Sequence, residues 1–345
     1  MLAPAGSGVV RDGTAAFVRP LPHPETTDGL SAADRALLDI GQYLRQRDYR
    51  FTTITPATHR RVLARAARGP ATLRDVFGWT RSFQSSDLPE EILAKLDVAG
   101  VLQTSGGELR SGVRFSTLGP QLFMHSAFPT DEADAVFFGP DTYRFARAIA
   151  QCIASAPAKQ QMRILDIGAG SGAGGLHAAA LLASRAPRIV LTDINERALR
   201  FARLNAALNR TPDVQVLRGD LYDKVDGRFD LIISNPPYLV DPLRRSYRHG
   251  GGGLGAELSL RIAEEGLARL APGGRLLLYT GSAIVDGVDL FHAALRERLR
   301  HHAVRLAYEE IDPDVFGEEL DAPPYDKADR IAAIAATIAP MLGDR

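Results

Sequence analysis

The sequence lacks the features that mark secreted, zinc-binding and membrane-spanning proteins. Its 345 residues include one cysteine, Cys152. A single cysteine excludes an intramolecular disulfide and a cysteine-based zinc site, so we expect Cys152 to be a small core residue in a reducing compartment. No apolar run approaches the roughly 20 residues that cross a bilayer, and the first residues do not resemble an export signal. We therefore expect a cytoplasmic protein with no membrane partner.

Metal ligands and an excess of one charge are also missing. The eight histidines show no His-x-x-x-His or comparable spacing, so no metal is predicted. The formal net charge is zero, which weighs against nucleic acid because phosphate neutralisation dominates such binding. A run of arginines between Arg45 and Arg81 has few acidic neighbours. It either contacts the phosphates of a nucleic acid or, in the simpler interpretation, forms a solvated helix face.

The character of the chain changes near residue 158. Residues 1–29 are rich in Pro, Gly, Ala and Thr without periodicity and are predicted to be a flexible arm. Helices, a Gly-Gly turn and two or three strands predict a winged-helix-like substrate-recognition domain over 30–128. Residues 129–158 are predicted to be a linker and lid helix, and 159–345 a cofactor-binding domain.

Short apolar runs alternate with helical stretches in this last region. The runs are "RILDI", "RIVLTD", "VQVLRG", "FDLIIS" and "GRLLLYT". Their alternation with helices predicts an α/β fold with a parallel, doubly wound, Rossmann-like sheet. Ligands of such sheets bind beyond the carboxyl ends of the strands, so the residues that end these runs are the candidate site.

A glycine loop follows the first run. Asp166 ends the strand, and glycines allow a tight turn that a ligand can approach closely, at Gly168, Gly170 and Gly172. The same loop also satisfies the G-x-G-x-x-G dinucleotide pattern, which is a weak signal. The loop alone therefore leaves the nucleotide open.

Acidic residues end the second and third runs. Asp193 lies about twenty residues beyond the glycine turn, where a carboxylate can accept both hydroxyls of a ribose. Asp220 can accept a hydrogen bond from the exocyclic amine of an adenine. Each aspartate singly also suits a helix N-cap, but a nicotinamide enzyme needs no Asp220. Together these strand-end residues favour an adenosine cofactor other than a nicotinamide dinucleotide.

The fourth run ends in "NPPY", residues 235–238. Pro236 and Pro237 remove two backbone donors and fix φ, so they end strand pairing and hold their neighbours rigidly. Asn-Pro is also an ordinary turn opener. The oxygen of Asn235 and the carbonyl of Pro236 can accept the two hydrogens of a planar amine, and Tyr238 can stack on it.

Together these motifs resemble class I S-adenosylmethionine-dependent methyltransferases of the Asn-Pro-Pro-Tyr group, over about residues 137–320. The group includes glutamine amide methyltransferases of release factors and exocyclic-amine methyltransferases of RNA and DNA. The resemblance implies that residues 159–345 are the methyltransferase domain, with S-adenosyl-L-methionine as cofactor and Asn235, Pro236 and Tyr238 as catalytic residues. The implied cofactor-binding residues are Asp166, Gly168, Gly170, Gly172, Asp193, Ile194, Asp220, Leu221, Asn235 and Tyr143.

One segment departs from that group. "FFGPDTYRF" is similar to the Pro-Asp-Thr segment of the glutamine methyltransferases, but Gly139 and Tyr143 replace the flanking Arg and Glu. This departure counts against the glutamine of a release factor as the methyl acceptor. The expected reaction is methyl transfer to a planar amide or exocyclic amine nitrogen of a protein, a nucleic-acid base or a small molecule.

Two alternatives remain. In a sealed pocket, the amine of the cofactor could attack its own carbon chain and release methylthioadenosine, with Tyr143 or Tyr238 stabilising the sulfonium. A non-catalytic cofactor-binding regulator is the other alternative. Beyond the motif, the glycines at 250–253 predict either a flap over the substrate or a plain linker. The acidic stretch "YEEIDPDVFGEEL" is expected to be an exposed strand and turn.

Overall fold

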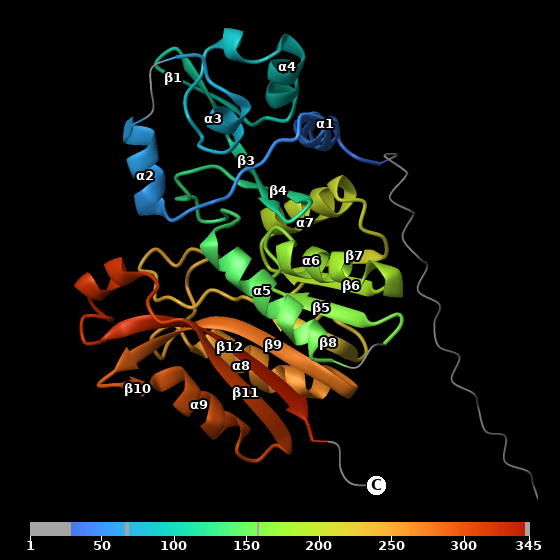
Figure 1. Cartoon of the computed structure of the whole chain (residues 1–345), viewed down its shortest axis with the longest axis vertical. Helices are drawn as coiled ribbons and strands as arrows, with labels where there is room; N and C mark the ends of the chain where they lie inside the picture. The colour runs from blue at the N-terminus through green and yellow to red at the C-terminus, as the bar shows by residue number, and fades with distance from the viewer. Residues whose placement is uncertain (1–28, 66–68, 157–158, 342–345) are drawn as a thin grey trace, which may run out of the picture.

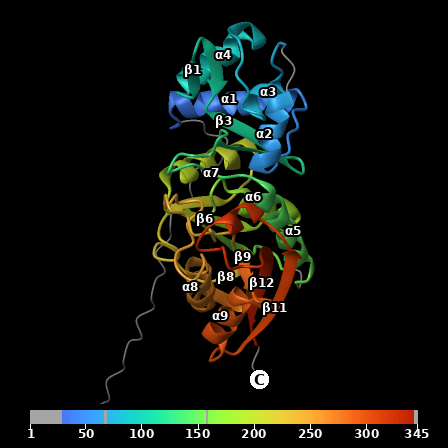
Figure 2. The same cartoon turned by 90° about the vertical axis from the view of Figure 1, so that its left-hand side faces the viewer.

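The computed structural model describes residues 29–341, except 66–68 and 157–158. The predicted flexible arm therefore lies, apart from Gly29, outside the described residues. Figures 1 and 2 show an elongated arrangement, with an N-terminal unit (residues 29–128) at one end and a sheet covered by helices at the other. None of the helices in the described ranges combines the length and apolarity needed to cross a bilayer.

The large sheet has the strand order β11-β12-β9-β8-β5-β6-β7. The short strand β10 also pairs with β9 but lies outside this order. The central strands β5 to β9 are parallel. Both faces of the sheet are covered, which explains why β5 and β8 are almost wholly buried. The strands are β5 (Arg163–Ile167), β6 (Arg188–Asp193), β7 (Val214–Arg218), β8 (Phe229–Ser234), β9 (Leu270–Val285), β10 (Val288–Asp289), β11 (Val304–Asp312) and β12 (Arg330–Pro340).

The predicted parallel sheet is mixed, because it includes an antiparallel strand next to one edge. β12 lies between β9 and β11 and runs antiparallel to both. The connection from β11 to β12 contains one short 3-10 helix, η4 (Gly317–Asp321), and no α-helix of the kind that usually joins parallel strands, so the chain returns antiparallel. The alanine-rich segment "RIAAIAATIAP" did not indicate a strand, although the expected exposed strand is found as the edge strand β11.

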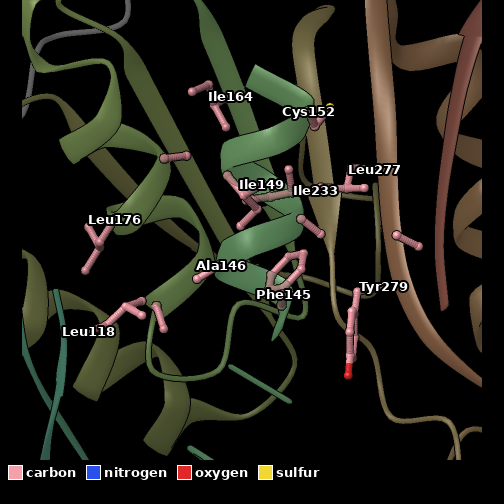
Figure 3. Close-up of a cluster of buried hydrophobic side chains, with 14 of the residues drawn as sticks. Leu118, Phe145, Ala146, Ile149, Cys152, Ile164, Leu176, Ile233, Leu277 and Tyr279 are labelled. Carbon is pink, nitrogen blue, oxygen red and sulfur yellow. The ribbon is translucent and has the colours of Figure 1, made fainter. Parts of the chain in front are cut away.

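Helices cover the two faces of the sheet. One apolar cluster joins the sheet to α5, α6 and α7, and another joins it to α8 and α9. Figure 3 shows Phe145, Ile149 and Cys152 of α5 facing the sheet residues Ile233 and Leu277. Cys152 is thus a buried core residue, as predicted. The helices are α5 (Pro140–Ala154), α6 (Ala173–Leu181), α7 (Glu196–Leu208), α8 (Glu257–Gly266) and α9 (Leu290–Leu299), with 3-10 turns η2 (Ala183–Arg185) and η3 (Leu267–Arg269).

The N-terminal unit combines short helices with two separate hairpins. The expected helix starts are present, because Ser31 accepts a hydrogen bond from the N–H of Asp34 at 3.0 Å and α2 begins at Pro56. The Gly106–Gly107 turn joins the first hairpin, with positive φ at both glycines. Its elements are α1 (Ala32–Gln46), α2 (Pro56–Arg65), α3 (Leu73–Phe77), η1 (Ser85–Asp87), α4 (Glu90–Val98), β1 (Leu102–Ser105), β2 (Glu108–Ser111), β3 (Val113–Leu118) and β4 (Gln121–Ser126).

The N-terminal unit and α7 share one apolar cluster. Phe201, Leu204 and Leu208 of α7 pack in it with core residues of the N-terminal unit. Asn205 of α7 also accepts from the N–H of Met124 at 2.7 Å and donates to its carbonyl at 2.9 Å. The edge strand β4 is therefore paired by side-chain amides of α7, and the two regions fold against each other through a common core.

Candidate functional site

A cavity opens at the carboxyl ends of β5, β6, β7 and β8, and the glycine loop forms one wall of it. Gly168 and Gly170 line the cavity and have φ of 65° and 55°. A Cβ added at either would meet no atom within 4 Å, so the space beside them is open to a ligand. Gly172 differs, because it does not line the cavity and its added Cβ would lie 3.2 Å from Leu191. Its role is packing at the start of α6.

Asp166 is buried at the base of this loop. Its Oδ2 atom accepts a hydrogen bond from the N–H of Gly175 at 2.7 Å. Burial raises the pKa of the carboxyl to about 7, and the nearby Asp193 adds to that increase. Asp166 therefore ionises near neutral pH in the free protein, and a cationic ligand beside it would favour the charged form.

Asp193 ends β6 and holds the glycine loop in place. Its two carboxylate oxygens accept from the N–H groups of Gly170 and Asn195, each at 2.9 Å. Burial raises the pKa of this carboxyl. The next residue, Ile194, exposes 56% of its surface although it is apolar, and it lines the cavity. An apolar side chain left open there suits a flat ligand surface.

Asp220 and Leu221 follow β7 on the same side of the cavity. Asp220 is exposed, and Leu221 is 8% exposed with a φ of 51°. A positive φ is unusual for a leucine and turns the chain sharply after the strand. The structure thus brings Asp166, Asp193 and Asp220 to one cavity, which is what the sequence predicts for strand ends of a parallel sheet.

The residues of the Asn-Pro-Pro-Tyr motif, 235–238, also line the cavity, after the strand that pairs with β5. β8 is tied to β5 just before them, because the Ser234 hydroxyl donates to the Ile167 carbonyl at 2.7 Å. Within the described chain, the Asn235 side chain has no hydrogen-bond partner, so its amide is available to a ligand. Tyr238 differs, because its hydroxyl donates to Asp141 at 2.7 Å. Tyr238 can therefore offer the cavity its ring rather than its hydroxyl.

Tyr143 does not reach the cavity, which corrects its predicted role. It lies in α5, where neighbouring residues differ in direction by about 100°. Asp141, Thr142 and Phe145 line the cavity, whereas the Tyr143 hydroxyl accepts from the N–H of Thr53 at 3.0 Å. Tyr143 joins α5 to the N-terminal unit, so its predicted contact with the cofactor is not supported.

A segment that the sequence did not indicate, residues 241–249, contributes lining residues to the cavity and is called the roof below. The N–H of Ser246 donates to the Ala133 carbonyl at 3.3 Å, and the Tyr247 hydroxyl donates to the Thr130 carbonyl. Asp241 holds the segment together through two bonds to the Arg245 guanidinium, at 2.7 and 2.9 Å. Ser246, Tyr247 and Arg248 line the cavity. No spacing in the sequence indicated that this loop lies across residues 130–137.

Two further aromatic residues were also missed. Phe137 lines the cavity with its ring parallel to that of Tyr247, at 6.1 Å between centroids. Phe316 lies in the turn after β11 and lines the cavity, with its ring edge-on to Tyr238 at 5.9 Å. Because Phe316 follows an acidic stretch, the sequence favoured exposure. The acceptor side of the cavity is thus walled by aromatic rings.

The glycine run after the roof is partly packed. Gly250 is buried, and a Cβ added there would lie 2.6 Å from the Pro237 carbonyl oxygen. Gly255 is similarly close to the carbonyl of Tyr238. These two glycines allow the chain to pass directly against the motif, so the run is neither a free flap nor a plain linker along its whole length.

The residues that line the cavity suit S-adenosylmethionine by charge and polarity. Three carboxylates lie on the side predicted to hold the cofactor, which carries a sulfonium and an ammonium. The open space beside Gly168 and Gly170 provides a backbone cradle, and Ile194 and Leu221 provide apolar surfaces. No cluster of three or more metal-ligating side chains occurs in the part of the chain that the structure describes.

The fold and cavity are similar to those of class I S-adenosylmethionine-dependent methyltransferase domains. The seven main strands have the order of that class, with one antiparallel strand next to the edge. Residues 144–285 match the family described as "Methyltransferase small domain". The chain is accordingly related to the glutamine and adenine-N6 methyltransferases of the Asn-Pro-Pro-Tyr group.

Individual relatives match part of the chain. A release factor glutamine methyltransferase of Koribacter versatilis is 33% identical over 173 residues, covering 46% of this chain and 58% of the relative. A tRNA1(Val) (adenine(37)-N6)-methyltransferase of Aeromonas hydrophila is 36% identical over 143 residues, covering 39% and 57%. The crystal structure of TrmN from Thermus thermophilus aligns with a TM-score of 0.40 and 19% identity, covering 83% of this chain and 78% of TrmN. The chain spans little more than half the length of these two sequence relatives.

Proposed function

We propose that this protein transfers the methyl group of S-adenosylmethionine to a planar amide or exocyclic amine nitrogen. The observation that carries the proposal is the unpaired Asn235 amide in a cavity that Asp166 and Asp193 also line. Asn235 and the Pro236 carbonyl would accept the two hydrogens of the acceptor amine and orient its lone pair.

The reaction is an in-line displacement that needs alignment more than a strong base. The acceptor nitrogen attacks the methyl carbon, and the electrons of the carbon–sulfur bond pass to sulfur. S-adenosylhomocysteine leaves, and the nitrogen gives up one proton to water. The Tyr238 ring would stack on the acceptor, while its hydroxyl stays bonded to Asp141.

Cofactor binding can be tested at Asp193. Replacing Asp193 by Ala removes the proposed ribose contact and the bond to the Gly170 N–H, so we expect S-adenosylhomocysteine to bind about 1 to 3 kcal/mol more weakly. Calorimetry measures this loss directly. Asp213→Ala is the matched control, because Asp213 pairs with Arg188 at the far end of β6 and does not line the cavity. Binding of NAD in place of S-adenosylhomocysteine would exclude the proposal.

The acceptor would be selected by the N-terminal unit and the roof. We propose residues 30–128 as a winged-helix-like recognition domain and 129–158 as its connection, because α5 contacts both Thr53 and the cavity. Arg60 and Arg61 of α2 are exposed and have no acidic partner among the described residues, which leaves a nucleic-acid acceptor open but not favoured. A steep salt dependence of RNA binding would support that acceptor. The cytoplasmic location stays a prediction.

The roof favours one second candidate. Because Tyr247 of the roof and Phe316 line the cavity and could exclude an outside acceptor, the amine of the cofactor could itself be the nucleophile. Its nitrogen would attack the cofactor's own carbon chain, break the carbon–sulfur bond and expel methylthioadenosine, with one proton passing to water. Asn235 would then orient that amine.

Mass spectrometry of the protein with S-adenosylmethionine alone separates the two reactions. Methylthioadenosine that forms rapidly and disappears in Asn235→Ala would establish the second candidate. A cofactor that stays intact until a cell extract is added, and then yields S-adenosylhomocysteine and a labelled acceptor, would establish methyl transfer. Locating the label identifies the acceptor.

A further inference from the structure

Asp141 lies at the start of α5 and joins two tyrosines that are distant in the sequence. The Tyr238 hydroxyl donates to its Oδ2 atom at 2.7 Å, and the Tyr279 hydroxyl donates to its Oδ1 atom at 2.8 Å. All three side chains are buried, and Asp141 exposes only 5% of its surface. Figure 3 shows Tyr279 beside Phe145, with its hydroxyl pointing away from the apolar cluster.

The positively charged side chain of Arg144 also contacts Asp141. The Arg144 guanidinium lies 3.1 Å from Asp141 and 2.7 Å from Asp312 at the end of β11. Asp141 therefore has a charge partner and two phenol donors, which compensate for the cost of burying its carboxylate. The network connects α5, the motif, β9 and β11 at one point.

The Tyr238 ring has little freedom as a result. A Cβ added at Gly281 would lie 2.4 Å from the ring, so Tyr238 packs directly on the backbone of β9. Phe316 lies edge-on to it. The ring is thus fixed by packing on one side and by its hydroxyl bond to Asp141 at its tip.

The geometry points to Asp141 as a positioning residue that orients the Tyr238 ring, and with it the Asn-Pro-Pro-Tyr turn, toward the acceptor. This inference rests on the proposed methyl transfer for its kinetic consequence only. Tyr238 acts as an aromatic surface and not as an acid or base, because its hydroxyl is committed to a buried carboxylate. Tyr279 and Arg144 act one step further away, by holding Asp141.

The structural part can be tested without any activity. In protein labelled with 3-fluorotyrosine, the fluorine resonance of Tyr238 is identified by its loss in Tyr238→Phe. We expect Asp141→Asn and Asp141→Ala to shift or broaden that resonance. Tyr308→Phe is the matched control, because Tyr308 donates to Asp289 at 2.8 Å away from the cavity. A Tyr238 resonance unchanged in both Asp141 variants would overturn the inference.

Kinetics then separate positioning from a general loss of folding. Asp141→Asn should lower kcat about tenfold to 100-fold, the effect of one hydrogen bond to a charged group, while S-adenosylhomocysteine affinity changes less than about threefold. In a Tyr238→Phe background the same change should add little. A full additional loss in that background would overturn the inference, because Asp141 would then act independently of Tyr238. If no turnover is found in the unmodified protein, the proposed function fails, but the fluorine spectra still decide the role of Asp141.

Discussion

The N-terminal unit and the cofactor cavity bury ionisable groups in opposite ways. The cavity buries the carboxyl of Asp166 and half-buries that of Asp193, beside open space. The N-terminal unit buries Arg114, His59 and His125, and no acidic residue of that unit is among the buried ones in the described ranges. The carboxyls beside the cavity can interact with a cationic ligand. The buried basic groups of the N-terminal unit are enclosed by its own core and contribute to its packing.

The buried basic groups depend on backbone and hydroxyl partners. Arg114 donates to the Gly78 carbonyl at 2.8 Å, and burial lowers its pKa to about 10. His125 bonds to the Ser116 hydroxyl at 2.8 Å and is held neutral by burial, which lowers its pKa well below the usual value. The difference from the cavity shows that a perturbed pKa alone does not mark a functional site.

Removing the N-terminal unit tests how far the two regions are separable. A chain that begins at Ala133 would expose Phe201, Leu204 and Leu208, each worth about 1.5 to 3 kcal/mol when buried. The expected loss, at most about 5 to 9 kcal/mol, is comparable to the stability of a whole domain. Urea unfolding followed by circular dichroism measures it. A truncated chain as stable as the full chain would show that the unit only rests on the sheet.

Acid should destabilise the N-terminal unit through His59. Burial lowers its folded-state pKa to about 4, so the unfolded chain binds the extra proton between about pH 6.5 and 4. Stability is therefore present above pH 6.5 and is lost as the pH falls, by about 2 kcal/mol at pH 5. Urea midpoints at pH 7 and pH 5 measure this loss. His59→Gln should reduce the dependence, and an equal slope in that variant would contradict the assignment.

Ligand affinity at the cavity should also rise with pH, but in a higher pH range and through a carboxyl. Asp166 has a pKa of about 7 in the free protein and must ionise to hold the ammonium of the cofactor. Its ionised fraction rises about tenfold from pH 6 to pH 8, so S-adenosylhomocysteine affinity should rise about tenfold and then level. Calorimetry across this range gives the profile. Asp166→Asn should bind weakly with a flat profile; a retained slope would place the titration elsewhere.

Part of the cavity was predictable because its residues sit at the ends of strands. The apolar runs indicated β5 to β9, and parallel pairing necessarily brings Asp166, Asp193 and Asp220 to one edge. Gly168 and Gly170 were identified by the same logic. Tyr143 was misplaced because a motif resemblance gives the position of a residue in a helix but not its partner across a domain interface.

By itself, the sequence determined the alternation of strands and helices, the positive-φ glycines and the rigid turn at Asn235, because these depend on residues close together in the chain. Only the tertiary structure decided the roof and the anchoring of Tyr238. Tyr247 bonds to Thr130 across 117 residues, and Tyr279 bonds to Asp141 across 138. Such contacts arise from how the sheet, α5 and the loops pack together, and no local spacing encodes them.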